Sequence, residues 1–343
     1  MSPPVVDLRS DTVTRPTPAM REAMFAAPLG DDVFGDDPVV LQLQVRAAEL
    51  LGTAAALFVP SGTMANQIAL RAHTQPGDEV IIGAGAHVWR HESGALAALA
   101  GVQTQVAGTG GMFTAADVRA CWRPVDPYSA PTRVVAVENT HNNAGGRVWD
   151  PAELRAVAEA AHALGMATHL DGARLWNAAV ACGRSERELA TGFDSISVCL
   201  SKGLGAPVGS LICGSTAFIA KCHRFRKMYG GGMRQVGFLA AAGLYALEHH
   251  RSRLADDHAS ARALAEVLVA VPGVRVDLAS VQTNIVMIDL DRAAASDVVT
   301  AAEARGVLLT ANGPQRIRVV THLDVDRAGV LHAARTIADL VAS

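Results

Sequence analysis

The chain has 343 residues, of which 50% are hydrophobic and 18% are charged, and this apolar content excludes an intrinsically disordered protein. The formal net charge of −3 offers no basic surface for nucleic acid, so we expect no nucleic-acid partner. The longest apolar run, residues 236–247, is shorter than the ~20 residues that a membrane-spanning helix needs, so we expect no membrane insertion.

In the middle of the chain, short apolar runs alternate with stretches of helical period, which predicts β-α-β units around a mostly parallel sheet. Several runs are apolar almost throughout, as expected of strands that are covered on both faces. The expected strands are Ala56–Val59, Glu79–Ile82, Val134–Glu138, Ala167–Leu170, Ser195–Cys199 and Ser210–Cys213. Among the helices expected between them is Pro151–Leu164, with Asp150 as N-cap and proline at the first helical position.

A helix is expected over Gln235–His249, and the pattern changes after it. The elements expected from there are helices over Ala255–Val271, Ala294–Arg305 and Arg327–Val341, and strands over Val274–Asp277, Asn284–Leu290, Val307–Thr310 and Ile317–His322. They form an α/β unit of sufficient size for a small domain. We therefore expect a large domain over residues 1–250, which includes the N-terminal arm, and a small C-terminal domain over residues 251–343.

The sequence also predicts the compartment. The first residues show no basic stretch followed by an apolar one, so we expect no secretory signal. The five cysteines are odd in number and include no C-x-x-C pair, which favours reduced thiols over disulfides or a zinc site. We expect a cytoplasmic protein.

Asp171 and Lys202 each follow an apolar run that is expected to be a strand. Both are therefore expected at the carboxyl edge of the sheet, where open α/β sheets bind ligands. A lysine enclosed there is suited to Schiff-base chemistry, and an aspartate beside it can hold the pyridine nitrogen of pyridoxal phosphate (PLP) in its protonated form. The spacing alone leaves open that Asp171 caps a helix and that Lys202 is a solvated loop residue.

The segment Ser61-Gly62-Thr63 follows an expected strand and begins a helical stretch. Exposed N–H groups and small hydroxyls at a helix N-terminus bind phosphate, and Ser201 can add a further hydroxyl. The alternative is an ordinary serine N-cap with glycine in a tight turn. Because the segment matches neither the P-loop nor the G-x-G-x-x-G pattern, ATP and dinucleotide binding are not favoured.

Two histidines and two arginines are further candidates. His87 and His141 each follow an expected strand, and for either of them taken alone an ordinary surface histidine is the favoured interpretation. Arg174 and Arg318 are each able to hold a carboxylate at two points, with a surface role as the alternative for Arg318. No histidine or cysteine pair has metal-ligand spacing, so we expect no metal site.

Two polar segments complete the candidates. Residues 7–14, Asp-Leu-Arg-Ser-Asp-Thr-Val-Thr, carry many side-chain oxygens without helical or strand period, and we interpret them either as an arm that packs on a neighbour or as part of a site. Residues 226–234 are basic and glycine-rich, which is typical of a solvated loop or of a segment that reaches a phosphate or a partner subunit.

Taken together, these segments resemble the low-specificity L-threonine aldolases, PLP enzymes of the aspartate aminotransferase fold (fold type I). The likeness is carried by residues 7–14, by Gly-Asp-Asp-Val-Phe-Gly-Asp-Asp-Pro at 30–38, by His-Leu-Asp-Gly-Ala-Arg at 169–174, by Cys-Leu-Ser-Lys-Gly-Leu-Gly-Ala-Pro-Val-Gly-Ser at 199–210, by Arg-Lys-Met-Tyr-Gly-Gly-Gly-Met-Arg-Gln at 226–235 and by Val-Val-Thr-His-Leu-Asp-Val at 319–325. The segments span nearly the whole chain, and their order makes the series far more specific than any one member.

The resemblance implies a role for each matching residue. Lys202 would bind PLP covalently, Asp171 would pair with the pyridine nitrogen and His87 would stack on the ring. Residues implied at the phosphate are Gly62, Thr63, Ser201 and, from a neighbouring subunit, Arg234. Residues implied at the substrate are Ser10, Arg174 and Arg318 for the carboxylate, and His141 for the β-hydroxyl side. The family also implies a homotetramer with shared active sites, in which Lys227 lies in a loop of subunit contacts.

The reaction implied is cleavage of L-threonine or L-allo-threonine, which are β-hydroxy-α-amino acids, to glycine and acetaldehyde. The base that takes the β-hydroxyl proton is left open between His87, His141 and a water molecule. Phe34 departs from the pattern, because relatives often carry tyrosine there. The alternatives are a PLP-dependent β-eliminating lyase, an aldolase selective for substrates such as β-phenylserine, and a cofactor-free binding scaffold.

Overall fold

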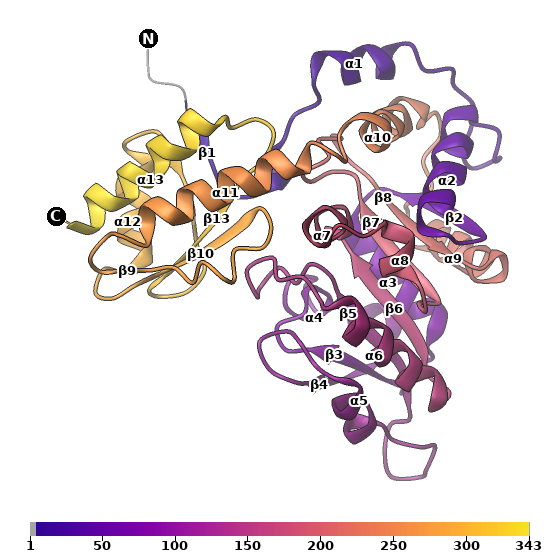
Figure 1. The fold of residues 1–343 in the computed structure, drawn as a ribbon. Helices are drawn as coiled ribbons and strands as arrows, with labels where there is room; N and C mark the ends of the chain where they lie inside the picture. Colours follow the sequence, from indigo (N-terminus) through magenta and orange to yellow (C-terminus); the bar gives the residue numbers. More distant parts are fainter. Residues whose placement is uncertain (1–4, 343) are drawn as a thin grey trace.

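The computed structural model describes residues 5–342. A seven-stranded sheet with its covering helices forms the larger part, and an α/β unit from the C-terminal third lies beside it, with α11 (Leu254–Leu268) running from one toward the other (Figure 1). Residues 1–4, which contribute to the expected lack of a secretory signal, and residue 343 lie outside the described residues. Within the described part, none of the helices combines the length and the apolar character needed to cross a membrane.

The large sheet has the strand order β2-β8-β7-β6-β5-β3-β4, and β8 alone runs antiparallel to its neighbours. Its strands are β2 (Ala55–Val59), β3 (Glu79–Gly83), β4 (Gln103–Ala107), β5 (Thr132–Glu138), β6 (Ala167–Gly172), β7 (Ser195–Cys199) and β8 (Ser210–Gly214). The six strands that the sequence predicts for this sheet are confirmed. Strand β4 was missed, because its polar and half-exposed residues at the edge of the sheet give no apolar run.

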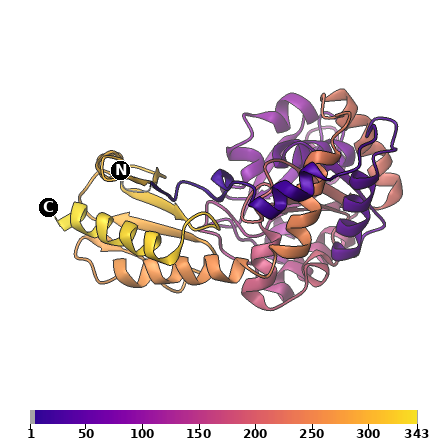
Figure 2. The same cartoon turned by 90° about the horizontal axis from the view of Figure 1, so that it is seen from above.

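Helices cover both faces of this sheet, and alternate residues along each strand explain why (Figure 2). Ile81 of β3 belongs to the cluster of buried side chains under one layer of helices, whereas Val80 and Ile82 belong to the cluster on the opposite face. The helices are α1 (Pro18–Phe25), α2 (Pro38–Leu51), α3 (Gly62–His73), α4 (His87–Arg90), α5 (Ala115–Cys121), α6 (Pro151–Ala163), α7 (Leu175–Cys182), α8 (Glu186–Ala190), α9 (Thr216–Met228) and α10 (Gly237–His249). The chain also forms a 3-10 turn over Asp11–Val13 and a π-helical turn over Leu96–Ala100.

The C-terminal unit packs two long helices on a four-stranded sheet of order β12-β13-β10-β9. Its elements are β9 (Val274–Arg275), β10 (Ile285–Leu290), α12 (Ala295–Glu303), β11 (Val307–Leu308), β12 (Thr310–Ala311), β13 (Arg316–Val320) and α13 (Arg327–Ala342). The single strand expected over Val307–Thr310 is wrong. It is two short strands, because β11 pairs with the N-terminal strand β1 (Val6–Asp7) while β12 pairs with β13.

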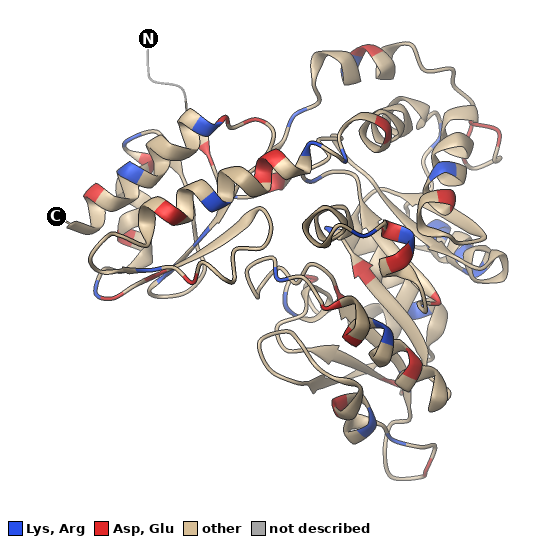
Figure 3. Ribbon diagram, viewed as in Figure 1, with Lys and Arg blue, Asp and Glu red and all other residues tan. Residues whose placement is uncertain are grey.

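The N-terminal arm joins this C-terminal unit. Strand β1 runs parallel to β11, and Val6 and Leu8 are buried in the same cluster of apolar side chains as α11 and α13. The division into domains at residue 250 stays a prediction. Acidic and basic residues are interspersed over both units (Figure 3).

Candidate active site

Asp171 and Lys202 lie at the same edge of the large sheet, as predicted. Asp171 is near the end of β6, which pairs in parallel with β7, and Lys202 lies in the loop that follows β7. Lys202 is half-buried, and its main-chain carbonyl oxygen accepts a hydrogen bond from Thr14 Oγ1 at 2.9 Å. The N-terminal arm therefore reaches the lysine loop directly.

The Asp171 carboxylate is buried and held by two donors. Its Oδ1 accepts from the Ala173 N–H at 3.1 Å, and its Oδ2 accepts from Asn66 Nδ2 at 2.8 Å. The same amide nitrogen donates to Glu92 Oε1 at 2.9 Å. Asn66, on α3, therefore fixes two buried carboxylates with one amide group.

A chain of buried polar groups continues behind Asn66. Its Oδ1 lies 3.1 Å from His169 Nε2, and His169 Nδ1 lies 2.9 Å from Ser195 Oγ. Because an amide oxygen only accepts, the hydrogen of neutral His169 is on Nε2, and Ser195 donates to Nδ1. Burial lowers the pKa of His169 to about 4, although the charge of Asp171 acts against this shift. Ser195 thus donates to His169, His169 donates to Asn66, and Asn66 donates to the Asp171 carboxylate at the end of the series.

His87 is the first residue of α4, and both its main chain and its ring form a hydrogen bond with a carboxylate. Its N–H donates to Glu138 Oε2 at 2.8 Å, and its Nδ1 lies 2.8 Å from Glu92 Oε1. Burial opposes a positive charge on the ring, but the hydrogen bond with Glu92 and the negative charge of Asp171 outweigh it, so the pKa of His87 lies above its usual value. His87, Glu92 and Asp171 offer ligand atoms within 4.8 Å of one another, yet they are hydrogen-bonded to each other or to Asn66. We therefore interpret them as a hydrogen-bonded cluster.

His141 is buried at the turn after β5. Its Nδ1 accepts from the Ala144 N–H at 3.2 Å, so the hydrogen of a neutral ring is on Nε2. That Nε2 has no hydrogen-bond partner among the described residues and lies 3.7 Å from Glu138 Oε2. The ring packs so closely under Gly111 that a β-carbon there would come within 2.6 Å of it. His141 is therefore fixed in place with one donor unused.

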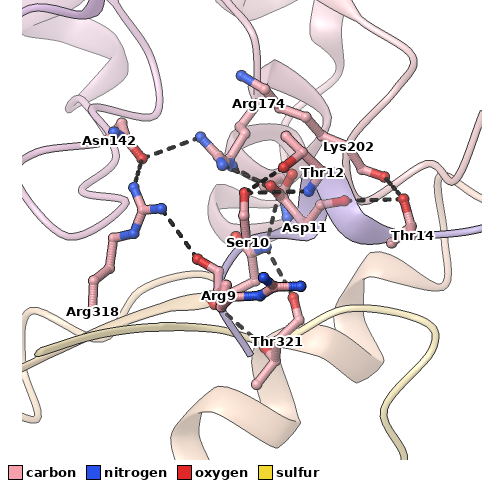
Figure 4. Close-up of polar contacts among 12 residues, drawn as sticks. Arg9, Ser10, Asp11, Thr12, Thr14, Asn142, Arg174, Lys202, Arg318 and Thr321 are labelled. Carbon is pink, nitrogen blue, oxygen red and sulfur yellow. Dashed lines mark hydrogen bonds and ion pairs between the residues drawn. The ribbon is translucent and has the colours of Figure 1, made fainter. Parts of the chain in front are cut away.

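Arg174 forms a two-point ion pair with Asp11 of the N-terminal arm (Figure 4). Its Nε donates to Oδ2 at 2.8 Å and its Nη2 donates to Oδ1 at 2.7 Å. Asn284 of the C-terminal unit donates to the same Oδ2 at 3.1 Å, so the pair joins the arm, the large sheet and the C-terminal unit. Burial opposes the charge on Asp11, but Arg174 outweighs it and holds the pKa of Asp11 well below its usual range.

Arg318, on β13, approaches the same place from the C-terminal unit (Figure 4). Its Nη1 donates to Asn142 Oδ1 at 3.0 Å, and Arg174 Nη1 lies 3.5 Å from that oxygen. Arg318 Nη2 donates to the main-chain oxygen of Arg9, next to Ser10. Ser10 is half-buried and is the N-cap of the 3-10 turn, where its Oγ accepts from Thr12. The structure thus brings together the three residues that were predicted to bind the substrate carboxylate.

The expected phosphate residues lie at the start of α3 and in the lysine loop. Gly62 is the first residue of α3, and a β-carbon there would come within 2.7 Å of Cys199 Sγ at the end of β7, so only glycine fits. Thr63 is exposed and Ser201, next to Lys202, is half-buried. The N-terminus of α3 is thus packed directly against the strand that carries the lysine loop.

Arg234 lies elsewhere in the single chain. Its side chain is 56% exposed, bonds to Asp31 at 3.0 Å and lies over the ring of Phe34. Next to it, Arg226 and Asp32 form a buried ion pair at 2.7 Å. The 226–235 and 30–38 segments are therefore packed together on the surface, and the contacts of Arg234 within the described chain are with the latter segment.

Sequence reasoning missed four residues that hold the site together: Asp11, Asn66, Glu92 and Asn142. Asp11 and Asn142 lie next to predicted residues, Ser10 and His141. Glu92 offered one signal, since it is an acidic residue five positions after His87 that ends up buried. Asn66 offered none, because its partners come from distant parts of the sequence.

Comparison with known proteins agrees with this geometry. Residues 7–291 match the beta-eliminating lyase family. The low-specificity L-threonine aldolase of Escherichia coli strain K12 is 44% identical over 332 residues, which are 96% of this chain and 97% of that protein. Low-specificity L-threonine aldolase 1 of Arabidopsis thaliana is 43% identical over 335 residues, 95% of this chain and 93% of that protein.

The fold is shared with solved structures at lower identity. Threonine aldolase from Leishmania major superimposes with a TM-score of 0.83 at 20% identity, over 98% of this chain and 99% of that one. An aspartate aminotransferase from Rhodobacter sphaeroides gives a TM-score of 0.76 at 19% identity, over 100% of this chain and 94% of that one. The predicted fold class, fold type I, is confirmed. With whole-length identity above 40% to two such enzymes, the chain belongs to the low-specificity L-threonine aldolases of the beta-eliminating lyase family.

Proposed function

We propose that this protein is a PLP-dependent aldolase that cleaves L-threonine and L-allo-threonine between Cα and Cβ, giving glycine and acetaldehyde. The observation that carries the proposal is the convergence of two guanidinium groups, from Arg174 and Arg318, at the sheet edge that holds Lys202 and Asp171. A lysine amine and an aspartate suit the cofactor, and the paired guanidinium groups suit an amino-acid carboxylate.

The residues present fit PLP. Asp171 is buried with its carboxylate fixed by Asn66, as a group that must face a pyridine nitrogen requires. The N–H groups at the start of α3 suit the phosphate, and Gly62 keeps this helix end tight against β7. When bound, PLP supplies an electron sink for the electron pair that is released as the Cα–Cβ bond breaks. Lys202 would hold it covalently, His87 would cover its ring, and Thr63, Ser201 and a partner subunit's copy of Arg234 would bind its phosphate.

The carboxylate-binding residues orient the substrate. Arg174 and Arg318 would each donate to the carboxylate, and Ser10 would add a hydroxyl from the N-terminal arm. Two charged, directional contacts fix the carboxylate and therefore the rotation about the adjoining Cα bond. Orientation by these side chains is what selects the bond to Cβ for cleavage.

The two histidines differ in which nitrogen is available. The Nδ1 of His87 faces the Glu92 carboxylate, which only accepts, so Nε2 of the neutral ring has a free lone pair. The hydrogen of neutral His141 is on Nε2, which can donate but cannot accept. We therefore assign His87 as the group that takes the β-hydroxyl proton, and His141 as a hydrogen-bond donor to the β-hydroxyl side.

One assay tests the reaction against the β-eliminating alternative. Purified protein supplied with PLP and L-threonine should produce acetaldehyde and glycine in equal amounts, without ammonia. Release of ammonia and a 2-oxo acid from the same substrate would instead identify a β-eliminating lyase. Comparing L-threonine, L-allo-threonine and β-phenylserine by kcat/KM then gives the substrate preference.

Self-association with shared active sites forms part of the proposal. Phe25, Phe34 and Met228 are 88%, 79% and 61% exposed, which favours a partner surface over isolated surface residues. Phe34 and Met228 lie in the two segments that pack around Arg234 and Lys227, so a second copy bound there would bring its own Arg234 near a site. We propose a homotetramer, and a cytoplasmic location consistent with the five cysteines, which are all free thiols.

A further inference from the structure

Asn142 occupies the point at which the two substrate-binding arginines meet. Its Oδ1 accepts from Arg318 Nη1 at 3.0 Å and lies 3.5 Å from Arg174 Nη1 (Figure 4). The Nε and Nη2 of Arg174 are already bonded to Asp11, so Nη1 is the end of that guanidinium group turned toward Asn142. Two cationic donors from different parts of the chain thus share one neutral oxygen.

The charges around this oxygen do not balance. Arg174 and Arg318 carry two positive charges and Asp11 carries one negative charge. Lys202 acts on Asp11 and Glu138 acts on Arg174, and because these two charges are opposite, one positive charge remains in the cluster. Burial and the charge of Arg174 both lower the pKa of Arg318, and its Nε is buried without a hydrogen-bond partner among the described residues. The cluster therefore matches a ligand with a single negative charge.

The Asn142 main chain is anchored independently of its side chain. Its N–H donates to Glu138 Oε1 at 2.9 Å, and the bridge between the neighbouring His141 and Arg147 closes the turn. A rotation of the side chain alone is therefore enough to withdraw Oδ1 from the two arginines. A carboxylate accepts from a guanidinium group at two points and carries the opposite charge, which a neutral amide oxygen lacks, so an incoming carboxylate wins the exchange.

We propose that Asn142 is a positioning residue that stands in for the substrate carboxylate. Its amide oxygen keeps the guanidinium groups of Arg174 and Arg318 aimed at one point, and it yields them to the carboxylate of the amino-acid substrate. A neutral amide is needed at this position, because an aspartate would supply the missing charge permanently. This inference rests on the proposed function, since it takes the ligand to be an α-amino acid.

Two substitutions test the role. Asn142→Asp keeps the shape and adds the charge, so the folded protein should gain stability, with Tm rising by roughly 2–4 °C. The same variant should bind substrate worse, with KM for L-threonine rising at least about tenfold while kcat changes much less, because the carboxylate must displace a charged group. Asn142→Ala should lower Tm and should change KM by less than about threefold.

The opposite signs of the stability and KM effects separate this role from a merely structural one. A lower Tm for Asn142→Asp, or an unchanged KM in that variant, would overturn the proposal. Acetate serves as a probe that carries only the carboxylate, and it should raise the Tm of wild type and Asn142→Ala but not of Asn142→Asp. If acetate and Tm behave so while L-threonine is not cleaved, the carboxylate site stands and the proposed reaction fails. If L-threonine is cleaved and the variants show no opposing effects, the role of Asn142 fails alone.

Discussion

Asp11 and Arg174 are 163 positions apart in sequence and form a two-point ion pair in which both side chains are buried. A buried pair is costly to break, because removing one partner leaves the other charge desolvated and uncompensated. The pair also anchors the N-terminal arm on the large sheet.

Asp11→Asn should lower the free energy of unfolding by about 3–5 kcal/mol, as removal of one member of a buried pair does. The matched control is Asp7→Asn, which removes the exposed pair with Arg9 and should cost about 0–1 kcal/mol. Urea denaturation at neutral pH measures both. Equal losses of unfolding free energy in the two variants would show that burial of the Asp11–Arg174 pair adds nothing to stability.

The same pair predicts a loss of stability in acid. The folded pKa of Asp11 lies below its unfolded value, so the stabilisation is present above about pH 4 and is lost as the pH falls below that value. Denaturation midpoints between pH 5 and about 2 should therefore fall more steeply for wild type than for Asp11→Asn. Parallel curves would contradict the assignment of the charge to Asp11.

Lys202→Ala should lose the covalent bond to the cofactor, since no other group replaces the amine. After incubation with PLP and reduction by borohydride, mass spectrometry should find the cofactor on the Lys202 peptide of wild type and on no peptide of the variant. The control is Lys221→Ala, which removes an exposed lysine on α9 and should keep the adduct. An adduct retained in Lys202→Ala would move the covalent role to another residue.

His87 predicts the acid side of the pH profile. Because the pKa of His87 is raised, the ring stays protonated to higher pH, and kcat/KM should rise through a midpoint above about 6.5. Glu92→Gln removes the negative charge of the group that accepts from His87 Nδ1, so it should move the midpoint to lower pH. A profile that is unchanged in Glu92→Gln would exclude His87 as the base, and full turnover in single alanine variants of His87 and His141 would favour a water molecule.

Buried His169 predicts a second loss of stability in acid. This loss comes from a basic group whose pKa is lowered by burial, and not from a carboxylate. Its folded pKa of about 4 lies below the unfolded value of about 6.5, so the unfolded state binds more protons between these limits. Stability should therefore fall as the pH drops from about 6.5 to 4, and His169→Gln should flatten this slope. His332 is exposed on α13, and His332→Gln should leave the slope as it is. Urea midpoints across this range measure both variants.

The exposed Phe34 tests self-association. Phe34→Ser should weaken it by removing apolar area from the surface around Arg234, which sedimentation at several protein concentrations detects. Tyr128 is 96% exposed but lies outside residues 30–38 and 226–235, so Tyr128→Ser is the control that should leave association unchanged. If both variants sediment like wild type, Phe34 lies outside the interface.

The sequence predicted the positions of side chains that directly follow a strand. An apolar run followed by a polar residue is enough to place Asp171 and Lys202 at one edge of the sheet, because parallel strands finish together. The motif at 7–14 pointed to the carboxylate site through resemblance alone, since it has neither helical nor strand period. The sequence analysis missed strand β4, because an edge strand with polar residues gives no apolar run.

The residues that the sequence analysis missed act through contacts with residues that are distant in sequence. Asn66 bonds to Glu92 and Asp171, and Asp11 bonds to Arg174 and Asn284, across separations that no local pattern encodes. Arg174 was predicted to bind the substrate, but its two-point contact with Asp11 could not be inferred from either segment. Long-range complementarity of charge is a property of the folded chain.

The pairing of β1 with β11 sets an order of events during synthesis. The arm is made before the large sheet, yet its partner strand and Asn284 follow the large sheet in the chain. The large sheet, with Arg174, can form in the meantime, whereas Asn284 and β11 are not yet made. The proposed carboxylate site, which includes Arg318 of β13, is therefore completed late, and a nascent chain that stalls before β11 carries the lysine loop without Arg318.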